Sequence, residues 1–349
     1  MGERPEATSE QGRENMTTHA DWRLDGHGRL GPVLRDCLRA AIAAPSIHNT
    51  QPWRFRPRPD GVDVFADHTR RLAVIDPSGR EVVISVGAAL LNLRVAILAH
   101  GRAPLIRLLP DPGEPDHIAR ITIGPATPVS DTVRLLAQAI PRRHTNRRPF
   151  LESVLPRQVL EELVTAAAIE GGHLAVADAR ARDAVLSLVR LAERRVRGEP
   201  AYWRELREWT AQSPQRRDGV PPEAFGPWSA LENVPIRDFG LVEPARHRRV
   251  AVFEAEPTIA LLYSAGDSRR QSAHTGQALE RTLLTATVRG VATTLMTQPL
   301  EIPHLRDLLT DPRSGLVPQA IVRFGYGPAS APTPRRPLEE VVEGFVGPD

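Results

Sequence analysis

The stretch Ala-Pro-Ser-Ile-His-Asn-Thr-Gln-Pro-Trp at residues 44–53 lies between an expected helix and an expected strand. Its two prolines fix φ, and serine and asparagine favour turns, so we predict a rigid bend with hydrogen-bonding side chains. Farther along, Arg-Arg-His-Thr-Asn-Arg-Arg-Pro-Phe at residues 142–150 concentrates four guanidinium groups. Arginine forks can hold a phosphate through paired hydrogen bonds. Together the two strings predict a site for a flat ring that carries a phosphate.

Flavin mononucleotide (FMN) is a ligand of this kind, and the composition of the chain agrees with such a role. With 349 residues, 41% hydrophobic and 25% charged, the chain can form one large or two modest soluble domains. The sequence contains no lysine, so arginine must make every contact of a basic side chain to a phosphate. The formal net charge is only +3, and we therefore expect no nucleic-acid partner.

Cys37 is the single cysteine, which excludes an intramolecular disulfide and a multi-cysteine metal site. Its position on the apolar side of an expected helix predicts a place in the core. The histidines are scattered without ligand spacing, so we predict no metal site. No run reaches the ~18 apolar residues of a membrane span, and the N-terminus lacks the apolar stretch of a signal peptide. We expect a cytoplasmic protein with no membrane partner and a disordered tail over residues 1–28.

Apolar periodicity predicts two halves of similar α+β plan. The elements expected in the first half are a helix over 32–44, a hairpin at 51–55 and 61–66, an apolar helix at 85–100, strands near 104–109 and 117–123, and a helix at 131–140. Those expected in the second half are a helix over 154–168, a strand at 173–178 and an apolar helix at 276–289. We interpret this similarity as a weak internal duplication.

Residues 197–245 interrupt the second half with a stretch rich in proline and aromatic residues. It contains Tyr202, Trp203, Trp209 and Trp228. Long insertions of this type are often lids or binding loops, and we predict a lid. An aromatic-anchored surface insertion with no role in binding is the alternative.

Several of these strings resemble the FMN-dependent nitroreductase family. Residues 45–53 resemble its Pro-Ser-x-x-Asn-x-Gln-Pro-Trp turn, and 142–145 resemble its Arg-Arg-Ser-x-Arg start. Residues 290–301 resemble the segment at the flavin edge, whereas 324–328 and 335–342 resemble the closing strand and tail. The pairing of Gln-Ala-Leu-Glu at 277–280 with Gln-Pro-Leu-Glu at 298–301 is similar to the Acg-like branch.

The resemblance implies a nitroreductase-like fold in which one chain mimics the usual dimer of two subunits. A single flavin site would then lie between a first half at 29–141 and a second half at 142–349, under the lid. The resemblance also implies hydride transfer from NAD(P)H to a small acceptor through the flavin N5 atom. Because the cofactor supplies the chemistry, we assign no catalytic residue.

The cofactor-binding residues that the resemblance implies belong to four segments. They are Pro45, Ser46 and Asn49 of the bend; Arg142, Arg143, His144, Asn146 and Arg147; Leu295, Met296 and Thr297; and Arg335 and Arg336. Among these, the candidates for the phosphate are Arg142, Arg143, Arg335 and Arg336, whereas Arg147 or Asn146 would reach the ribityl chain or the pyrimidine oxygens. A backbone N–H of 295–297 is the candidate for flavin N5. For two of these segments, a role without cofactor binding is the alternative: residues 45–49 could form a simple turn, and residues 142–148 could form a solvated basic face.

Motifs for other chemistries do not occur in the sequence. We find no Gly-x-Gly-x-x-Gly helix start, no Walker sequence and no Gly-x-Ser-x-Gly elbow. The leading hypothesis is therefore an FMN-dependent NAD(P)H oxidoreductase. The alternatives are a protein that sequesters flavin with little or no turnover, and a scaffold without flavin that acts only in protein interaction.

Overall fold

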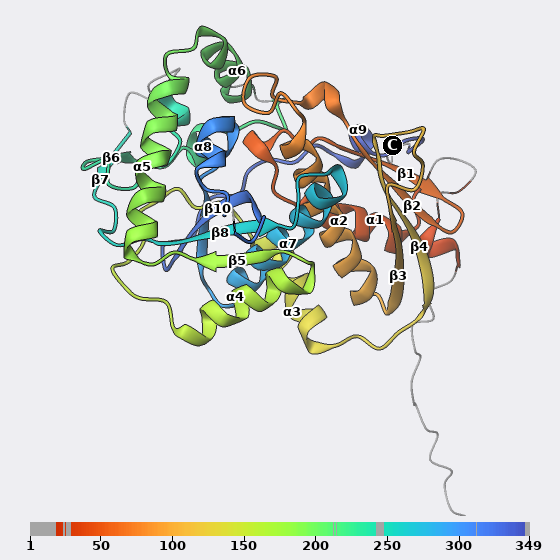
Figure 1. Ribbon diagram of the computed structural model, residues 1–349. Coiled ribbons are helices and arrows are strands. Elements are labelled where there is room, and N and C mark those ends of the chain that lie inside the picture. The colour runs from red at the N-terminus through yellow and green to blue at the C-terminus, as the bar shows by residue number, and fades with distance from the viewer. Residues whose placement is uncertain are drawn as a thin grey trace, which may run out of the picture.

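The computed structural model describes residues 19–23, 25, 29–211, 213, 215–241, 248–311 and 313–345. Most of the predicted disordered tail, residues 1–18, lies outside these ranges. Two antiparallel four-stranded sheets lie on opposite sides of a central pair of long helices (Figure 1). The mixture of helices and antiparallel sheets confirms the α+β class.

The first sheet has the strand order β1-β2-β4-β3. The elements of this half are α1 (Pro32–Ile42), β1 (Trp53–Arg58), β2 (Gly61–Ala66), α2 (Arg80–Ala99), β3 (Arg102–Leu108), β4 (His117–Ala126) and α3 (Asp131–Ala139). Apolar side chains of α1 and α2 pack on this sheet, and Cys37 and Trp53 are fully buried there. The expected core position of Cys37 is confirmed.

The second sheet has the strand order β5-β8-β10-β9. Its elements are α4 (Arg157–Ile169), β5 (His173–Val176), β8 (Thr258–Ser264), α7 (Arg269–Val288), β9 (Ala292–Leu295) and β10 (Val317–Gly325). Across each sheet, the neighbouring strands are the first, second, fourth and third of that sheet in sequence order. In each sheet, a 20-residue helix connects the second strand in sequence to the third. The two sheets therefore share one topology.

The halves differ mainly in how their first two strands are joined. A two-residue turn connects β1 to β2, whereas residues 177–257 separate β5 from β8. The long connection contains the predicted insertion and holds α5 (Ala179–Val196), α6 (Pro200–Thr210), β6 (Trp228–Ser229) and β7 (Val250–Ala251). In Figure 1, α5 and α6 lie at the upper left, far from the first sheet.

The C-terminal segment crosses back to the first half. After α8 (Pro303–Asp307) and β10, the chain reaches α9 (Leu338–Val341), whose apolar residues join the core around α1. The Glu343 N–H donates to the carbonyl of Phe55 in β1 at 2.8 Å. The end of the second half thus packs against an edge strand of the first.

Both central helices begin earlier than the sequence pattern predicts. Helix α2 begins at Arg80 instead of residue 85, and α7 begins at Arg269 instead of Gly276. Polar acceptors stabilise these first turns: Asp76 Oδ2 accepts from the Val82 N–H at 3.1 Å, and Ser268 Oγ accepts from the Gln271 N–H at 3.3 Å. The spacing of apolar residues cannot predict helix turns that are stabilised by polar side chains.

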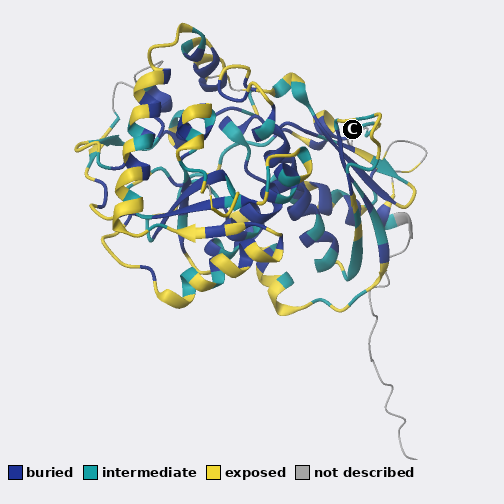
Figure 2. Cartoon of the chain, in the orientation of Figure 1, coloured by how far each residue is buried: buried dark blue, intermediate teal, exposed yellow. Residues whose placement is uncertain are grey.

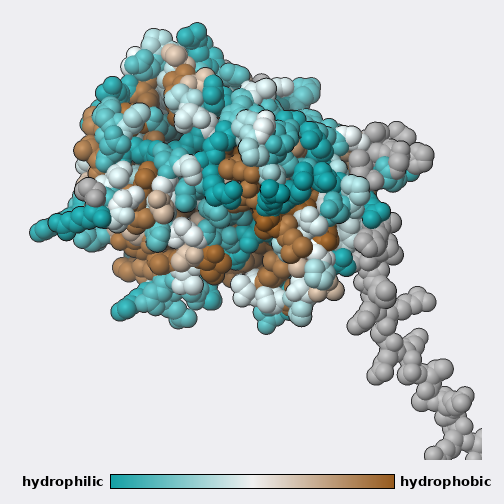
Figure 3. Space-filling model, turned by 45° about the vertical axis from the view of Figure 1, so that its right-hand side comes forward, coloured by the Kyte–Doolittle hydropathy of each residue, from teal (hydrophilic) through white to brown (hydrophobic). Residues whose placement is uncertain are grey.

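Helix α2 also corrects the expectation that no run is apolar enough to span a membrane. Among the described residues, it is the helix with the length and composition of such a span, with a mean hydropathy of 2.2. Within that window 83% of the residues are buried inside the protein, as the dark centre of Figure 2 shows. On the face shown in Figure 3, apolar residues form separate patches among hydrophilic ones. Helix α2 is therefore the core helix that the sequence predicted.

Glycine sets the distance between α2 and α7. A Cβ atom on Gly87 of α2 would collide with the Ala273 carbonyl oxygen and lie 3.0 Å from the Gly276 Cα. A Cβ on Gly276 would collide with the Ile84 carbonyl oxygen. The two backbones thus touch directly at this crossing, and no larger residue fits.

We expect Gly276→Ala to lower the free energy of unfolding by about 2 kcal/mol or more, because the new methyl group meets rigid backbone. Denaturant unfolding followed by circular dichroism measures this loss. Gly266→Ala is the matched control, since its Cβ would meet only Gln271 Cγ at 3.9 Å. Equal stability of the two variants would contradict the close crossing.

Candidate functional site

A cavity lies between the two halves, beside the crossing of α2 and α7. It surrounds about 930 Å³ of space free of atoms, part of it open to solvent. Its wall combines the bend at 45–49, residues of α2, the arginine-rich string, the end of β9, residues 333–335 and part of the long insertion. The bend at 45–49 and the arginine-rich string at 142–150 therefore meet at one site.

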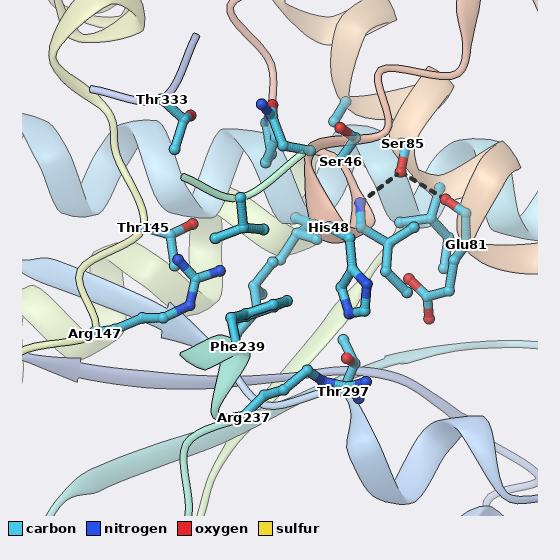
Figure 4. A pocket seen from close by; sticks show the side chains of 18 of the residues that line it. Ser46, His48, Glu81, Ser85, Thr145, Arg147, Arg237, Phe239, Thr297 and Thr333 are labelled. Carbon is cyan, nitrogen blue, oxygen red and sulfur yellow. Dashed lines mark hydrogen bonds between the residues drawn. The ribbon is translucent and has the colours of Figure 1, made fainter. Parts of the chain in front are cut away.

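The bend is held in a strained conformation. His48, Asn49 and Gln51 have φ values of 46°, 56° and 51°, in the left-handed region that few non-glycine residues adopt. Ser46 Oγ accepts from the Gln51 N–H at 2.9 Å and closes the turn. Ser85 Oγ of α2 accepts from the Ile47 N–H at 3.4 Å, an interaction drawn in Figure 4. Side-chain hydrogen bonds thus fix the bend on α2.

Two arginines, the buried Arg143 and the half-buried Arg335, donate to backbone carbonyls at the C-terminal end of α1. Arg143 Nη2 donates to the Ala43 carbonyl at 3.3 Å, and Arg335 Nη2 donates to the Ala43 and Ala44 carbonyls at 3.1 and 3.2 Å. Such carbonyls at a helix C-terminus lack partners within the helix and attract cations. Arg335 Nη1 also donates to Asn49 Oδ1 at 3.1 Å, which ties this arginine to the bend.

The same arginines keep donors free at the cavity. The Nε atoms of Arg143 and Arg335 are both buried and have no hydrogen-bond partner among the described residues. Glu280 Oε1 of α7 lies 3.5 Å from Arg143 Nε, too distant and poorly directed for a hydrogen bond. Unused buried donors of this kind are costly and mark a place for an anion.

Electrostatics at this end of the cavity reflect crowding of like charges. Burial and the neighbouring Arg143 lower the pKa of Arg335 to about 9. Burial raises the pKa of Glu280 to about 7, against the opposing effect of Arg143. Two guanidinium groups therefore face one carboxyl that is only partly ionised near neutral pH, and the site favours a bound anion.

The opposite wall comes from the long insertion and the end of β9. Arg237 Nη2 donates to Glu301 Oε2 at 2.6 Å, and Thr297 Oγ1 donates to Glu301 Oε1 at 2.7 Å. Burial favours a lower pKa for Arg237, but Glu301, Tyr202 and Glu193 together outweigh it and raise the pKa. Burial and Arg237 lower the pKa of Arg147 to about 10. This wall is thus also cationic.

Phe239 fills the space between these walls (Figure 4). Its ring meets His48 edge-on with centroids 4.9 Å apart, and the Arg147 guanidinium lies over it at 4.7 Å. Phe239 is 3% exposed, and both ring nitrogens of His48 are buried without a partner. Burial, then Arg237 and Arg147, lower the pKa of His48 well below its usual range, so this ring is neutral. The insertion therefore reaches the bend through one aromatic contact.

The structure brings most of the predicted site residues to this cavity. Those that line it are Pro45, Ser46, Asn49, Arg143, Arg147, Leu295, Thr297 and Arg335. Those that do not line it are Arg142, His144, Asn146, Met296 and Arg336.

The residues outside the cavity have other partners. Arg142 is exposed and donates to the Gln138 carbonyl, whereas Asn146 is turned toward the Pro328 carbonyl. Met296 alternates away from Leu295 and Thr297 into an apolar core. Arg336 donates to Gln51 and Glu340. His144 is half-buried, and burial together with Arg143 lowers its pKa to about 4.

Sequence reasoning missed Glu81, Arg237 and Phe239 in the wall, and Glu280 beside Arg143. Glu81 and Glu280 are buried carboxyls on the two apolar helices, and a charged residue in such a pattern is the signal that marks them. Burial raises the pKa of Glu81 to about 7, despite its pairing with Arg80. Arg237 and Phe239 lie in the insertion, where no periodicity indicates which side chains point inward.

Comparison with known proteins agrees with the motifs. The model of the nitroreductase family matches residues 140–326. The Mycobacterium tuberculosis (strain H37Rv) protein "Putative NAD(P)H nitroreductase Rv3131" is 35% identical over 92% of this chain and 94% of its own length. "Putative NAD(P)H nitroreductase acg" of the same strain is 33% identical over 88% and 95%. The nitroreductase NfnB of Mycobacterium smegmatis, solved in complex with NADPH, is 14% identical over 60% of this chain and 97% of its own, with a TM-score of 0.36 that is too low for inference.

The raised pKa of Glu280 predicts a pH-dependent contribution to stability. A carboxyl whose pKa rises from 4.5 to about 7 on folding binds more protons in the folded state between these values. Its contribution is full below about pH 4.5 and is lost as pH rises through 7. We compare the free energy of unfolding of the native chain with that of the Glu280→Gln variant. The difference, native minus variant, should fall by about 1.4 kcal/mol for each unit of pH increase between pH 4.5 and about 7.

Denaturant unfolding between pH 5 and 8 measures this difference. Taking the difference removes the opposite contributions of His48 and His144, whose lowered pKa values favour the folded state at higher pH. Glu161→Gln, at an exposed residue of α4, is the control and should give a flat difference. A flat curve for Glu280→Gln would show that Glu280 is ionised throughout this range.

Proposed function

Because this chain belongs to the nitroreductase family, in its Acg-like branch, we propose that it binds one FMN and acts as an NAD(P)H-dependent oxidoreductase. The observation that carries the proposal is the pair of unpartnered buried Nε–H donors of Arg143 and Arg335 beside the strained bend. A phosphate accepts such donors and compensates the excess positive charge. The residues present therefore fit the cofactor.

We assign the phosphate of FMN to Arg143 and Arg335, because both line the cavity and both donate to backbone carbonyls at the C-terminal end of α1. The bend at 45–49 would receive the ring, with Ser46 and Asn49 as polar neighbours. Leu295 and Thr297 would border its opposite edge. When bound, FMN supplies hydride acceptance and return, while these residues orient it and the insertion excludes water.

We further propose that one chain takes the place of the usual two subunits. The equal strand orders of the two sheets and the matching 20-residue helices support this interpretation. So does the return of the C-terminal segment to β1, which binds one half to the other. The halves would run over 29–141 and 142–349, with a lid within the long insertion, and the acceptor would be a small molecule.

Replacing Arg143 by Ala should weaken FMN binding by about 1.5–3 kcal/mol, which is the worth of a charge-assisted hydrogen bond. Titration of the protein with FMN, followed by the quenching of flavin fluorescence, measures the dissociation constant. Arg142→Ala is the control, since Arg142 is adjacent in sequence but exposed. Equal losses in the two variants would remove Arg143 from the site.

A protein that sequesters flavin without turnover is the second candidate function. The observation that favours it is Phe239, buried between His48 and Arg147, where a nicotinamide ring needs access to the flavin. A lid that stays closed would keep the flavin from its electron donor.

Replacing Phe239 by Ala distinguishes the two functions. For an oxidoreductase with a gating lid, we expect bound FMN to be bleached by NADPH under anaerobic conditions, and faster in Phe239→Ala than in the native chain. Trp203→Ala, also in the insertion but outside the cavity wall, should leave the rate unchanged. Absence of bleaching in all three proteins would favour sequestration over turnover.

A further inference from the structure

A second cavity lies within the long insertion, between α5 and the strands β6 and β7. It surrounds about 820 Å³ of space free of atoms, part of it open to solvent. Apart from Arg147 and Arg237, its lining residues are separate from those of the first cavity. Its wall is strongly basic, and the arginines that line it are Arg147, Arg190, Arg194, Arg197, Arg237 and Arg248.

Carboxylates balance only part of this charge. Arg248 pairs with Asp238, Arg237 pairs with Glu301, and Arg197 lies 3.5 Å from Glu193. Arg147, Arg190 and Arg194 have no carboxylate partner among the described residues. The lining holds six arginines and three carboxylates, which leaves three positive charges in excess. Glu301, outside the lining, pairs with Arg237 and reduces this excess to two.

Backbone carbonyls orient two of these three arginines, Arg190 and Arg147, whereas Arg194 is exposed. Arg190 Nη1 donates to the carbonyls of Glu232 and Asn233 at 3.5 and 3.3 Å, and Arg147 Nη1 donates to the Ala224 carbonyl at 3.0 Å. Neutral carbonyls position a guanidinium without neutralising it, so its charge remains available to a ligand. On α5, Arg190, Arg194 and Arg197 recur at helical spacing and share one side.

Aromatic side chains form another part of this wall. Phe225, Trp228 and Phe253 line the cavity, and the Arg248 guanidinium lies over the Trp228 ring at 4.7 Å. Phosphate groups suit the arginines, and a planar base suits the aromatic rings. A nucleotide combines both chemistries.

The two cavities adjoin each other. Arg147 and Arg237 line both of them, and Phe239 packs against Arg147 at the boundary. A ligand long enough to contact both linings would place one end at the bend and the other in the basic cavity. A dinucleotide has the form required to occupy both.

We propose that the second cavity binds the phosphate-bearing adenosine end of the electron donor, so that the chain prefers a donor with an additional phosphate. This inference rests on the proposed function, because it assigns the donor of that same site. The 2′-phosphate of NADPH supplies the negative charge that Arg190 and Arg194 lack within the protein.

Binding of adenosine 2′,5′-bisphosphate to the purified protein tests the inference without any redox reaction. Isothermal titration calorimetry should show binding to the native chain that is weakened about tenfold or more in the double variant Arg190→Gln/Arg194→Gln. The double variant Arg180→Gln/Arg195→Gln is the matched control, because it removes equal charge from exposed residues of α5 that do not line the cavity. Its affinity should equal that of the native chain.

Three results would overturn the inference: no binding of the bisphosphate to the native chain, equal affinity in both double variants, or binding of inorganic phosphate as tight as that of the bisphosphate. The last would assign the cavity to a free anion. Absorbance of bound FMN is recorded in parallel. A chain that holds FMN but not the bisphosphate ends this inference alone, whereas a chain that holds the bisphosphate but not FMN ends the proposed function.

Discussion

The contact between Gly87 and Gly276 is the constraint on which the structure depends. It packs α2 directly against α7 between the two sheets, and it fixes the distance between the residues that each helix contributes. Ser85 holds the bend from α2, and Glu280 faces Arg143 from α7. The positions of the groups that α2 and α7 contribute to the site thus depend on a single backbone contact. Such a contact is rigid, because packed backbones cannot move aside as flexible side chains can.

Beside this crossing, the cavity is lined by more arginine than carboxylate side chains. Arg143, Arg335 and Arg147 are held by backbone carbonyls, which orient guanidinium groups but do not cancel them. Burial of an uncompensated charge is costly, and residues that bear such a cost commonly serve a ligand. The same reasoning applies to both cavities, and it explains why a chain without lysine places arginine at each of them.

Much of the fold follows from local pattern. Apolar spacing predicts α1, α3, α4 and the two central helices, and alternation predicts the hairpin of β1 and β2, because these elements are stabilised by neighbours in sequence. The strand at 173–178 is confirmed as β5, yet its partner β8 is reached only after the whole insertion. The first turns of α2 and α7 are missed, because side-chain acceptors rather than apolar residues stabilise them.

By itself, the sequence determined the family, the bend, the arginines and the apolar helices, because each is encoded in residue types a few positions apart. Only the tertiary structure decided which of these arginines face a cavity. Adjacent residues such as Arg142 and Arg143 have opposite environments, one exposed and one buried against the α1 carbonyls. It also decided that Arg237 and Phe239 join the wall, that Glu280 lies beside Arg143, and that the C-terminal segment returns to β1. These are contacts between distant parts of the chain, and no local pattern records which distant groups will meet in the folded core.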